Sequence, residues 1–159
     1  MANVLVFGHQ NPDNDAIMSA VVLSQLLNQV EYAGNTYEAC ALGALPAESA
    51  KLLTDAGVAE PRQIASVEEG QLVVLTDHNE SAQSVEGLKS ATVFGVVDHH
   101  RIGDFETAGP LHYLAFPWGS SCTIVTKVAQ MLGIELSNVQ AKLLLSAMMT
   151  DTLMLKSPT

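Results

Sequence analysis

Residues Leu72–Glu80 read LVVLTDHNE: an apolar run that ends in threonine and is followed at once by four polar residues. A short unbroken apolar run is typical of a strand that is buried on both faces of a parallel sheet. Ligands of such sheets bind beyond the carboxyl ends of the strands. The run Leu72–Thr76 therefore predicts a central strand, and Asp77–Glu80 mark the edge where a site is expected.

The rest of the chain alternates short apolar runs with segments of helical periodicity. Further strands are predicted at Val4–Phe7, Glu38–Leu42, Thr92–Val97 and Leu111–Phe116. Helices are predicted from an N-cap at Asp15, from Pro46 to before Gly57, from Ser120 or Ser121 to Leu132, and from Asn138, capped by Ser137, to about Thr150. This order predicts an α/β fold: a doubly wound, mainly parallel sheet with helices on both faces.

Length and composition limit the class of protein. The chain has 159 residues, which fits a single domain, 1–159, at about 150 residues per domain. Apolar residues make up 48% of it and charged residues 15%, unlike a disordered chain. No apolar run approaches the roughly 18 residues of a membrane span, and Met1–Gly8 has no basic segment before an apolar one. We therefore expect neither a membrane partner nor a signal peptide.

Charge and cysteine content limit the classes of partner and the cellular compartment that we expect. Seven Lys and Arg against seventeen Asp and Glu give a net charge of −10. Because such a chain lacks the basic surface that holds nucleic-acid phosphates, we expect no nucleic-acid partner, whereas cations remain plausible ligands. Cys40 and Cys122 have no metal-binding spacing. We interpret both as buried thiols of a reducing compartment and expect a cytoplasmic location.

Acidic and histidine residues recur at the predicted strand ends. A single aspartate after a strand is more often a turn former or a helix cap than a ligand. Several carboxylates held together repel one another and require a cation, and their mixture with imidazoles favours a transition metal over Ca²⁺. This number of ligands favours two ions, which can clamp a transferring phosphoryl group. The segments are His9–Asp15, Asp77–Glu80, Asp98–His100 and, after the last predicted helix, Asp151.

Other phosphate and catalytic motifs do not occur in the sequence: there is no GxxxxGK[ST], GxGxxG, HExxH or GxSxG. The motifs that do occur are Gly8–Asp15 (GHQNPDND), Asp77–Glu80 (DHNE), Asp98–Ile102 (DHHRI) and Thr150–Thr159 (TDTLMLKSPT). Together they resemble the DHH phosphoesterase superfamily and, within it, the family II, manganese-dependent inorganic pyrophosphatases. The Asp-His-His triplet marks only the superfamily, whereas DHNE and the closing KSPT are similar to the pyrophosphatases.

The resemblance spans essentially the whole chain, and its motifs have the family's order and spacing. It implies a Rossmann-like DHH domain and hydrolysis of inorganic pyrophosphate to two phosphates by a hydroxide that bridges two metal ions. The implied ions are Mn²⁺, with Co²⁺ or Mg²⁺ as alternatives. Carried over residue by residue, it implies that His9 and Asp13 hold one ion, that Asp15, His99 and Asp151 hold the other, and that Asp77 bridges the two.

The resemblance gives other residues a place beside the metals. His100 would face the substrate, so the implied catalytic residues are His100 and Asp77. His78 and Asn79 match the motif without a settled role, and we interpret His78 as a hydrogen-bond partner that fixes Asp77. Asp98 is expected to act on one of the two histidines that follow it. His112, which has no partner motif, is interpreted as structural.

The family also has a second domain with basic residues that grip pyrophosphate. Of the seven basic residues here, only Arg101 and Lys156 lie near a ligand motif. We therefore interpret the chain as the N-terminal, metal-binding domain, with the C-terminal substrate-binding domain absent and little activity expected alone. The resemblance further implies a homodimer formed through this domain.

Two alternatives stay open. The first is another DHH phosphoesterase that acts on a nucleotide or an oligonucleotide end, for which Phe116 and Trp118 are the nearby aromatic residues that could hold a base. The second is a metal-binding and dimerisation domain without turnover. Comparing pyrophosphate hydrolysis by this chain and by one extended past Thr159 would separate the catalytic from the non-catalytic interpretation.

Overall fold

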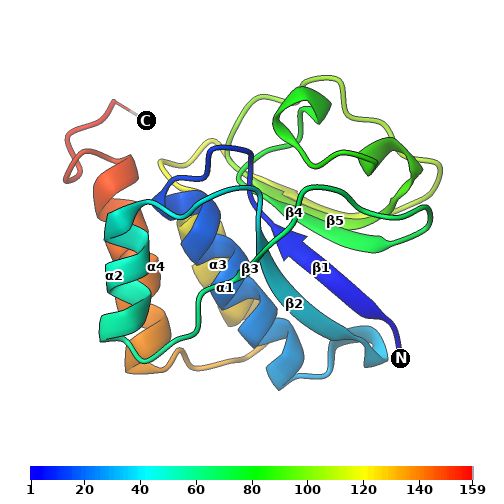
Figure 1. Cartoon of the computed structure of the whole chain (residues 1–159). Helices are drawn as coiled ribbons and strands as arrows, with labels where there is room; N and C mark the ends of the chain where they lie inside the picture. Colours follow the sequence, from blue (N-terminus) through cyan, green and yellow to red (C-terminus); the bar gives the residue numbers. More distant parts are fainter. Residues whose placement is uncertain (159) are drawn as a thin grey trace.

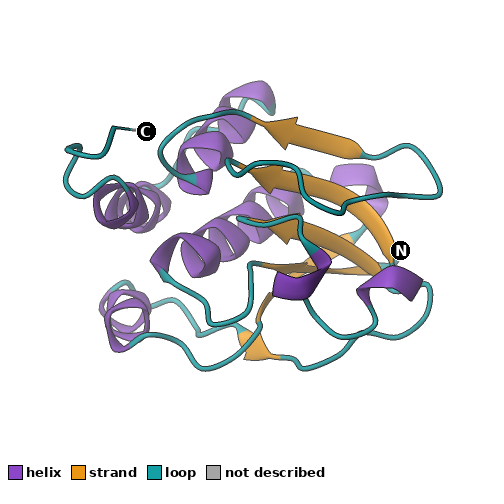
Figure 2. Cartoon of the chain, turned by 90° about the horizontal axis from the view of Figure 1, so that it is seen from above, coloured by secondary structure: helices purple, strands orange, loops and turns teal. Residues whose placement is uncertain are grey.

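The computed structural model describes residues 1–158, and in this range the strands form a single six-stranded sheet (Figure 1). The strands are β1 (Asn3–Phe7), β2 (Thr36–Ala41), β3 (Arg62–Gln63), β4 (Leu72–Thr76), β5 (Thr92–Asp98) and β6 (His112–Ala115). Every neighbouring pair is parallel, and the strand arrowheads in Figure 2 point the same way. The predicted α/β class with a parallel sheet is confirmed.

The strand order is β3-β2-β1-β4-β5-β6. Strands β1, β2 and β3 therefore follow one another from the centre of the sheet to one edge, and β4, β5 and β6 follow one another from the centre to the other edge. In open sheets of this kind the loops after the two central strands diverge and leave a crevice, and this is where ligands bind. The loops that follow β1 and β4 thus meet at the centre of one sheet edge, with the loop after β5 beside them.

The α-helices share one face of the sheet. They are α1 (Asn14–Gln29), α2 (Ala47–Asp55), α3 (Ser121–Met131) and α4 (Asn138–Asp151). Helix α1 is the central one, because it packs against β1, β2, α3 and α4 and is buried along most of its length. Among the described residues, no helix has both the length and the apolar character needed to cross a membrane.

The opposite face is covered by the short 3-10 helices η2 (Ser81–Gln83) and η3 (Leu88–Ser90) and by loops, seen in green above the strands in Figure 1. A second apolar cluster, which includes Phe7 and Leu75, lies under this cover. Helices therefore lie on both faces, but the four predicted helices all lie on the first face, and only 3-10 helices that were not predicted lie on the second. A third 3-10 helix, η1 (Tyr32–Gly34), joins α1 to β2.

Helix boundaries follow the predicted capping chemistry, with two corrections. Ser120 caps α3, and Ser137 caps α4 in a complete capping box. Helix α1 is capped by Asp13, whose Oδ1 accepts the N3 amide at 2.9 Å, and not by Asp15. Asp15 lies instead in the first turn of α1. Asp151 is the last residue of α4 and does not follow the helix as predicted.

Three residues interpreted as structural have structural surroundings. Cys40 and Cys122 are buried free thiols. The ring of His112 packs against those of Tyr32 and Phe94, with centroids 5.7 and 5.6 Å away, and Nε2 of His112 lies 3.2 Å from the Tyr32 hydroxyl. This aromatic group lies away from the carboxyl ends of the strands, since His112 begins β6.

Candidate metal centre

Gly8 lets the loop after β1 lie directly on the first turn of α1. A Cβ at Gly8 would be 2.5 Å from the Cβ of Ala16, closer than real carbon atoms approach, so a side chain here would push the loop away. The loop brings His9 over the start of α1, where Asp13 caps the helix. His9 Nε2 lies 3.6 Å from Asp13 Oδ2.

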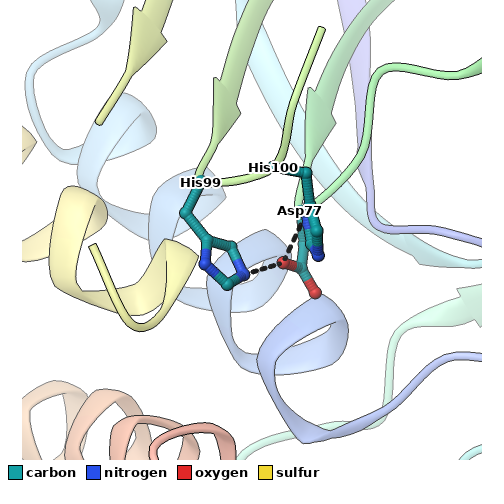
Figure 3. A group of neighbouring side chains, drawn as sticks. All are labelled: Asp77, His99 and His100. Atoms are coloured by element: carbon teal, nitrogen blue, oxygen red, sulfur yellow. Dashed lines mark ion pairs between the residues drawn. The ribbon is translucent and has the colours of Figure 1, made fainter. Parts of the chain in front are cut away.

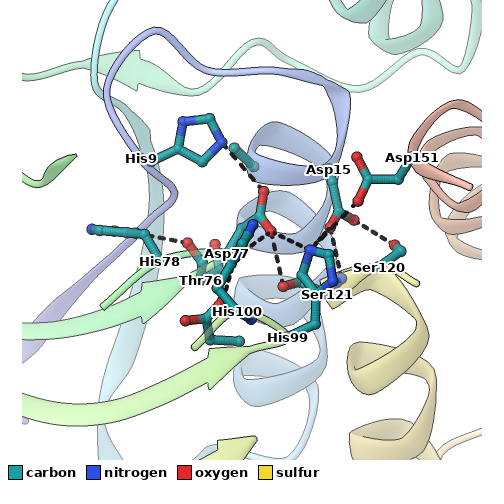
Figure 4. A network of polar contacts seen from close by, with 12 residues as sticks. His9, Asp15, Thr76, Asp77, His78, His99, His100, Ser120, Ser121 and Asp151 are labelled. Carbon is teal, nitrogen blue, oxygen red and sulfur yellow. Dashed lines mark hydrogen bonds and ion pairs between the residues drawn. The ribbon is translucent and has the colours of Figure 1, made fainter. Parts of the chain in front are cut away.

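Six predicted ligands come together at the carboxyl edge of the sheet, and Figure 4 labels all of them except Asp13. They form two groups, and within each group the potential ligand atoms all lie within 4.8 Å of one another. The first group is His9, Asp13 and Asp77, and the second is Asp15, His99 and Asp151. These are the residues that the family resemblance divides between two ions.

Asp77 belongs to the first group and also faces the second. Its Oδ2 is 3.4 Å from Nε2 of His9, and its Oδ1 is 3.2 Å from Nε2 of His99 (Figure 3 shows the His99 side). This is the arrangement that a bridging carboxylate needs. The backbone of Asp77 has φ 59°, in the left-handed region that few residues other than glycine adopt. Such a conformation is often retained at functional sites.

Asp15 is fully buried where α3 begins. Its Oδ1 accepts hydrogen bonds from the Ser120 hydroxyl at 2.7 Å and the Cys122 amide at 2.9 Å, and its Oδ2 accepts one from the Ser121 amide at 2.6 Å. These donors and the positive end of the α3 dipole favour the ionised form. Burial, and then the charge of Asp77, nevertheless raise the pKa of Asp15 to about 7.

The remaining carboxylates and imidazoles shift one another's pKa values. Burial raises the pKa of Asp77, but hydrogen bonds from His9 and His99 outweigh it and hold that pKa well below its usual range. Hydrogen bonds to Asp13 and then Asp77 raise the pKa of His9 to about 11. Burial lowers the pKa of His99, but contact with Asp77 raises it overall to about 9. Burial, then the charge of Asp77, raises the pKa of Asp151 to about 6.

Within the described chain, no Lys or Arg forms an ion pair with any carboxylate of the two groups; their cationic partners are histidines. Carboxylates whose only charged partners are imidazoles fit a pair of divalent ions, which bind ionised aspartates and neutral histidines. The donor set, with oxygen and nitrogen ligands mixed in each group, suits transition metals.

His100 has a different partner from the ligand histidines. Its Nδ1 lies 2.8 Å from Asp98 Oδ1, and its backbone amide donates to the same oxygen at 3.1 Å. Asp98 thus acts on His100 and not on His99, the other partner considered. His100 also forms a third group with Asp77 and His99, drawn in Figure 3, although its Nδ1 is 3.7 Å from Asp77 Oδ1.

Asn79, for which the sequence indicates no settled role, hydrogen-bonds to Asp98 and to the loop after β5. Its Nδ2 donates to Asp98 Oδ2 at 2.7 Å and to the Arg101 carbonyl at 2.8 Å. Its Oδ1 accepts from the Gly103 amide at 2.7 Å. The buried amide therefore joins the end of β4 to the loop after β5.

The interpretation of His78 as a partner of Asp77 is wrong. His78 Nδ1 donates to the Thr76 carbonyl at 2.9 Å, and Nε2 lies 2.9 Å from the Ser84 hydroxyl. Burial lowers the pKa of His78, which favours the neutral ring. The ring packs beside Phe7 on the opposite face of the sheet, because successive side chains at a strand end point to opposite faces.

The two cations expected near the site are both exposed. Arg101 pairs with Glu80, with Nη2 3.0 Å from Oε1. Lys156 lies in the turn after α4. Thr159, the last residue of the closing motif, lies outside the described residues. Sequence reasoning missed Ser121, predicted only as a helix cap, whose hydroxyl donates to Asp77 Oδ1 at 3.1 Å. Its place at a helix start was visible, but no local signal shows which carboxylates lie there.

Known proteins are similar to this chain in sequence and in fold. The chain is 48% identical over 161 aligned residues to a probable manganese-dependent inorganic pyrophosphatase of Streptococcus agalactiae. The match covers 100% of this chain and 51% of that protein, so the chain spans about half the length of the curated relatives it matches. It is also similar to the crystal structure of a putative family II inorganic pyrophosphatase of Methanococcus jannaschii, with a TM-score of 0.85 and 34% identity, over 98% of this chain and 50% of that one.

A more distant structure shares the fold alone. It is an exopolyphosphatase-related protein of Bacteroides fragilis, 19% identical, with a TM-score of 0.70 over 99% of this chain and 48% of that one. The family described as the DHH family, N-terminal domain, matches residues 3–154, nearly the whole chain. The chain therefore belongs to the DHH family and carries its N-terminal domain.

Proposed function

We propose that this chain is the metal-binding part of a manganese-dependent inorganic pyrophosphatase, which hydrolyses pyrophosphate to two phosphates. The observation that carries the proposal is the placement of Asp77, whose two oxygens face two separate groups of histidines and aspartates. The similarity of the chain to a relative named as a probable manganese-dependent inorganic pyrophosphatase supports the choice of substrate and metal.

The proposed ligands divide between two ions that share Asp77. Two divalent ions would bring four positive charges to the four carboxylates, and the same ligands suit Mn²⁺, Co²⁺ or Mg²⁺. Bound there, the ions would supply a hydroxide nucleophile near neutral pH and positive charge for the transferring phosphoryl group. The proposed ligands are His9, Asp13 and Asp77 for one ion and Asp15, His99, Asp151 and Asp77 for the other.

His100 and Asp77 are the proposed catalytic residues. The hydrogen bond to Asp98 raises the pKa of His100, although burial opposes it, and this shift favours the protonated ring. Because Nδ1 is held by Asp98, the half-exposed ring keeps Nε2 for the substrate. We propose that Nε2 donates its proton to the departing phosphate oxygen, while Asp77 fixes the spacing of the two metal groups.

Binding pyrophosphate requires more positive charge than the described residues offer beside the centre. Arg101 follows the proposed ligand His99 by two residues, but Glu80 already pairs with it. We propose that residues 1–159 form the N-terminal domain and that basic residues of a C-terminal domain, absent from this chain, bind the substrate. The length of the curated relatives, about twice that of this chain, supports this division.

The nucleotide alternative finds little support. Phe116 and Trp118 stack on each other with ring centroids 4.4 Å apart, and both pack against the apolar core. A base would have to displace one of these contacts before it could stack. Pyrophosphate, which has no base, needs no such platform.

We further propose a homodimer formed through this domain in a reducing, cytoplasmic compartment. Strand β6 is a sheet edge of four residues, whereas β3 at the other edge has two, so β6 is the better surface for a second strand. The buried free thiols Cys40 and Cys122 fit a reducing compartment. Sedimentation equilibrium of the chain tests the dimer, and a single monomeric species would contradict it.

The test of the function uses a chain extended past Thr159 through the second half of the family's length. With Mn²⁺ it should release phosphate from pyrophosphate, and a chelator should stop the reaction. Nucleotides and short oligonucleotides serve as competing substrates, and their preferential hydrolysis would favour the other phosphoesterase function. Metal binding without hydrolysis of any of them would favour a non-catalytic domain.

A further inference from the structure

Ser121, the first residue of α3, contacts the two most buried carboxylates of the centre. Its backbone amide donates to Asp15 Oδ2 at 2.6 Å, and its hydroxyl donates to Asp77 Oδ1 at 3.1 Å (Figure 4). The side chain is fully buried, and among the described residues this is its only hydrogen bond. One residue thus ties a carboxylate of the second group to the carboxylate that lies between the groups.

The two oxygens of Asp77 have different surroundings. Oδ2 faces His9 at 3.4 Å, whereas Oδ1 faces His99 at 3.2 Å and also accepts the Ser121 hydroxyl. His100 Nδ1 is farther from Oδ1, at 3.7 Å, and hydrogen-bonds to Asp98 instead. A histidine that binds a metal through Nε2 can no longer donate from that atom. Once His9 and His99 serve as ligands, the Ser121 hydroxyl is therefore the side-chain donor that still holds this carboxylate.

We propose that Ser121 is a positioning residue for the second metal ion. Its hydroxyl holds the carboxylate of Asp77 in the rotation that turns Oδ1 towards Asp15, His99 and Asp151. The inference rests on the proposed function, because it requires two ions that share Asp77. It is separate from helix capping, since Ser120 supplies the cap of α3.

Removing the Ser121 hydroxyl should lower metal affinity unequally at the two groups. In Ser121→Ala, the carboxylate of Asp77 can rotate about its Cβ–Cγ bond and serve one ion at the expense of the other. Hydrogen-bond partners of metal ligands typically affect metal affinity on the order of 10–100-fold. We expect a loss of this size at the second group, and less than about threefold at the first, because the partners of Oδ2 are unchanged.

The experiment measures each group by itself. His9→Ala weakens the first group and Asp151→Asn the second, so each background leaves one group to be titrated with Mn²⁺ while the electron paramagnetic resonance of the free ion is recorded. Ser121→Ala should weaken binding in the His9→Ala background and leave it nearly unchanged in the Asp151→Asn background. Ser121→Thr, which keeps a hydroxyl, should restore affinity.

Ser24→Ala is the matched control. Ser24 is a buried serine of α1 whose hydroxyl donates to the Val21 carbonyl at 2.8 Å, away from the carboxylates. The Ser24→Ala substitution should leave Mn²⁺ binding unchanged in both the His9→Ala and the Asp151→Asn backgrounds. Metal-free melting curves of all variants establish that they fold, so that a difference in affinity reports the site.

Two failures can be told apart. If the unsubstituted chain binds fewer than two Mn²⁺ ions, the proposed function and the positioning role fall together. If it binds two ions and Ser121→Ala changes neither background, or weakens both equally, only the positioning role of Ser121 is overturned.

Discussion

Asp77 is the one residue whose substitution should weaken both metal ions. Asp77→Asn keeps the size of the side chain but removes the charge that His9 and His99 both face. His9→Ala should weaken mainly the ion of the first group, because His9 contacts only that side. Metal titration of the two variants checks this, and an Asp77→Asn chain with one intact site would show that Asp77 does not bridge.

Protons should leave the centre when Mn²⁺ binds. Without metal the pKa values of His9 and His99 are raised to about 11 and about 9, so both rings are protonated at pH 7.5. Both must be neutral to act as ligands, so binding of two ions should release about two protons at this pH. Calorimetry in buffers of different ionisation enthalpy measures the number. No release would mean that the histidines are not ligands.

Single residues also mark the limit of what the sequence predicts. The position of an aspartate at the end of an apolar run was enough to place Asp77, because parallel strands end at the same sheet edge. The surroundings of His78 were not predictable, since they depend on which face of the sheet the strand end presents. The contacts of Ser121 were not predictable for a similar reason, because its acceptors lie 44 and 106 residues away along the chain.

At the scale of elements, the tight contact between the loop after β1 and α1 should be essential. Gly8→Ala would place its Cβ within 2.7 Å of the Cα and carbonyl oxygen of Ala16. We expect a loss of about 1–3 kcal/mol in the free energy of unfolding, as overpacking usually gives, together with weaker Mn²⁺ binding at His9 and Asp13. Urea denaturation and metal titration measure the two effects.

Gly109→Ala is the control for that substitution. Gly109 is exposed and does not have a left-handed backbone, and a Cβ added to it would have no heavy atom within 4 Å. The stability of this variant should stay within about 0.5 kcal/mol of the unsubstituted chain. Equal stability of the two alanine variants would contradict the importance of the Gly8 contact.

Element boundaries were predictable wherever a local signal existed. Apolar runs located the five longer strands, and serine caps located α3 and α4. Strand β3 was missed because its two residues, Arg62 and Gln63, are exposed and form no apolar run. The cap of α1 was misplaced because Asp13 and Asp15 both suit a cap, and only the packing of α3 onto Asp15 decides between them.

At the scale of the whole molecule, this chain should hydrolyse pyrophosphate poorly or not at all while still binding Mn²⁺. Pyrophosphate is a compact polyanion, and the chain has a net charge of −10 with few cations beside the centre. Phosphate release by this chain and by one extended past Thr159 gives the comparison. A similar turnover rate in both would mean that Arg101, Lys156 and the metals suffice.

Metal binding should also stabilise the fold. A ligand that binds only the folded chain adds about 2.7 kcal/mol at 100 times its dissociation constant, and a domain of this size gains roughly 2–4 °C in melting temperature per kcal/mol. We therefore expect saturating Mn²⁺ to raise the melting temperature at pH 7.5 and a chelator to reverse the gain. Asp98→Asn should keep most of it, because Asp98 contacts His100 and Asn79 and lies in neither ligand group.

The pH dependence of this gain follows from the signs of the pKa shifts. Without metal, the raised pKa values of His9 and His99 stabilise the fold below pH 6.5, and this contribution is lost as the pH rises through about 9 and 11. The raised pKa values of Asp15 and Asp151 act in the same direction, because the fold favours the protonated forms of both carboxyls. This contribution to stability is lost as the pH rises from 3.8 through the pKa of Asp151, about 6, and that of Asp15, about 7. The metal-free chain should therefore melt at a lower temperature at pH 9 than at pH 6, whereas the gain from Mn²⁺ should grow over the same range and shrink below about pH 6, where protons compete for the ligands. A melting curve indifferent to Mn²⁺ at pH 7.5 would count against a metal centre here, whichever residues were its ligands.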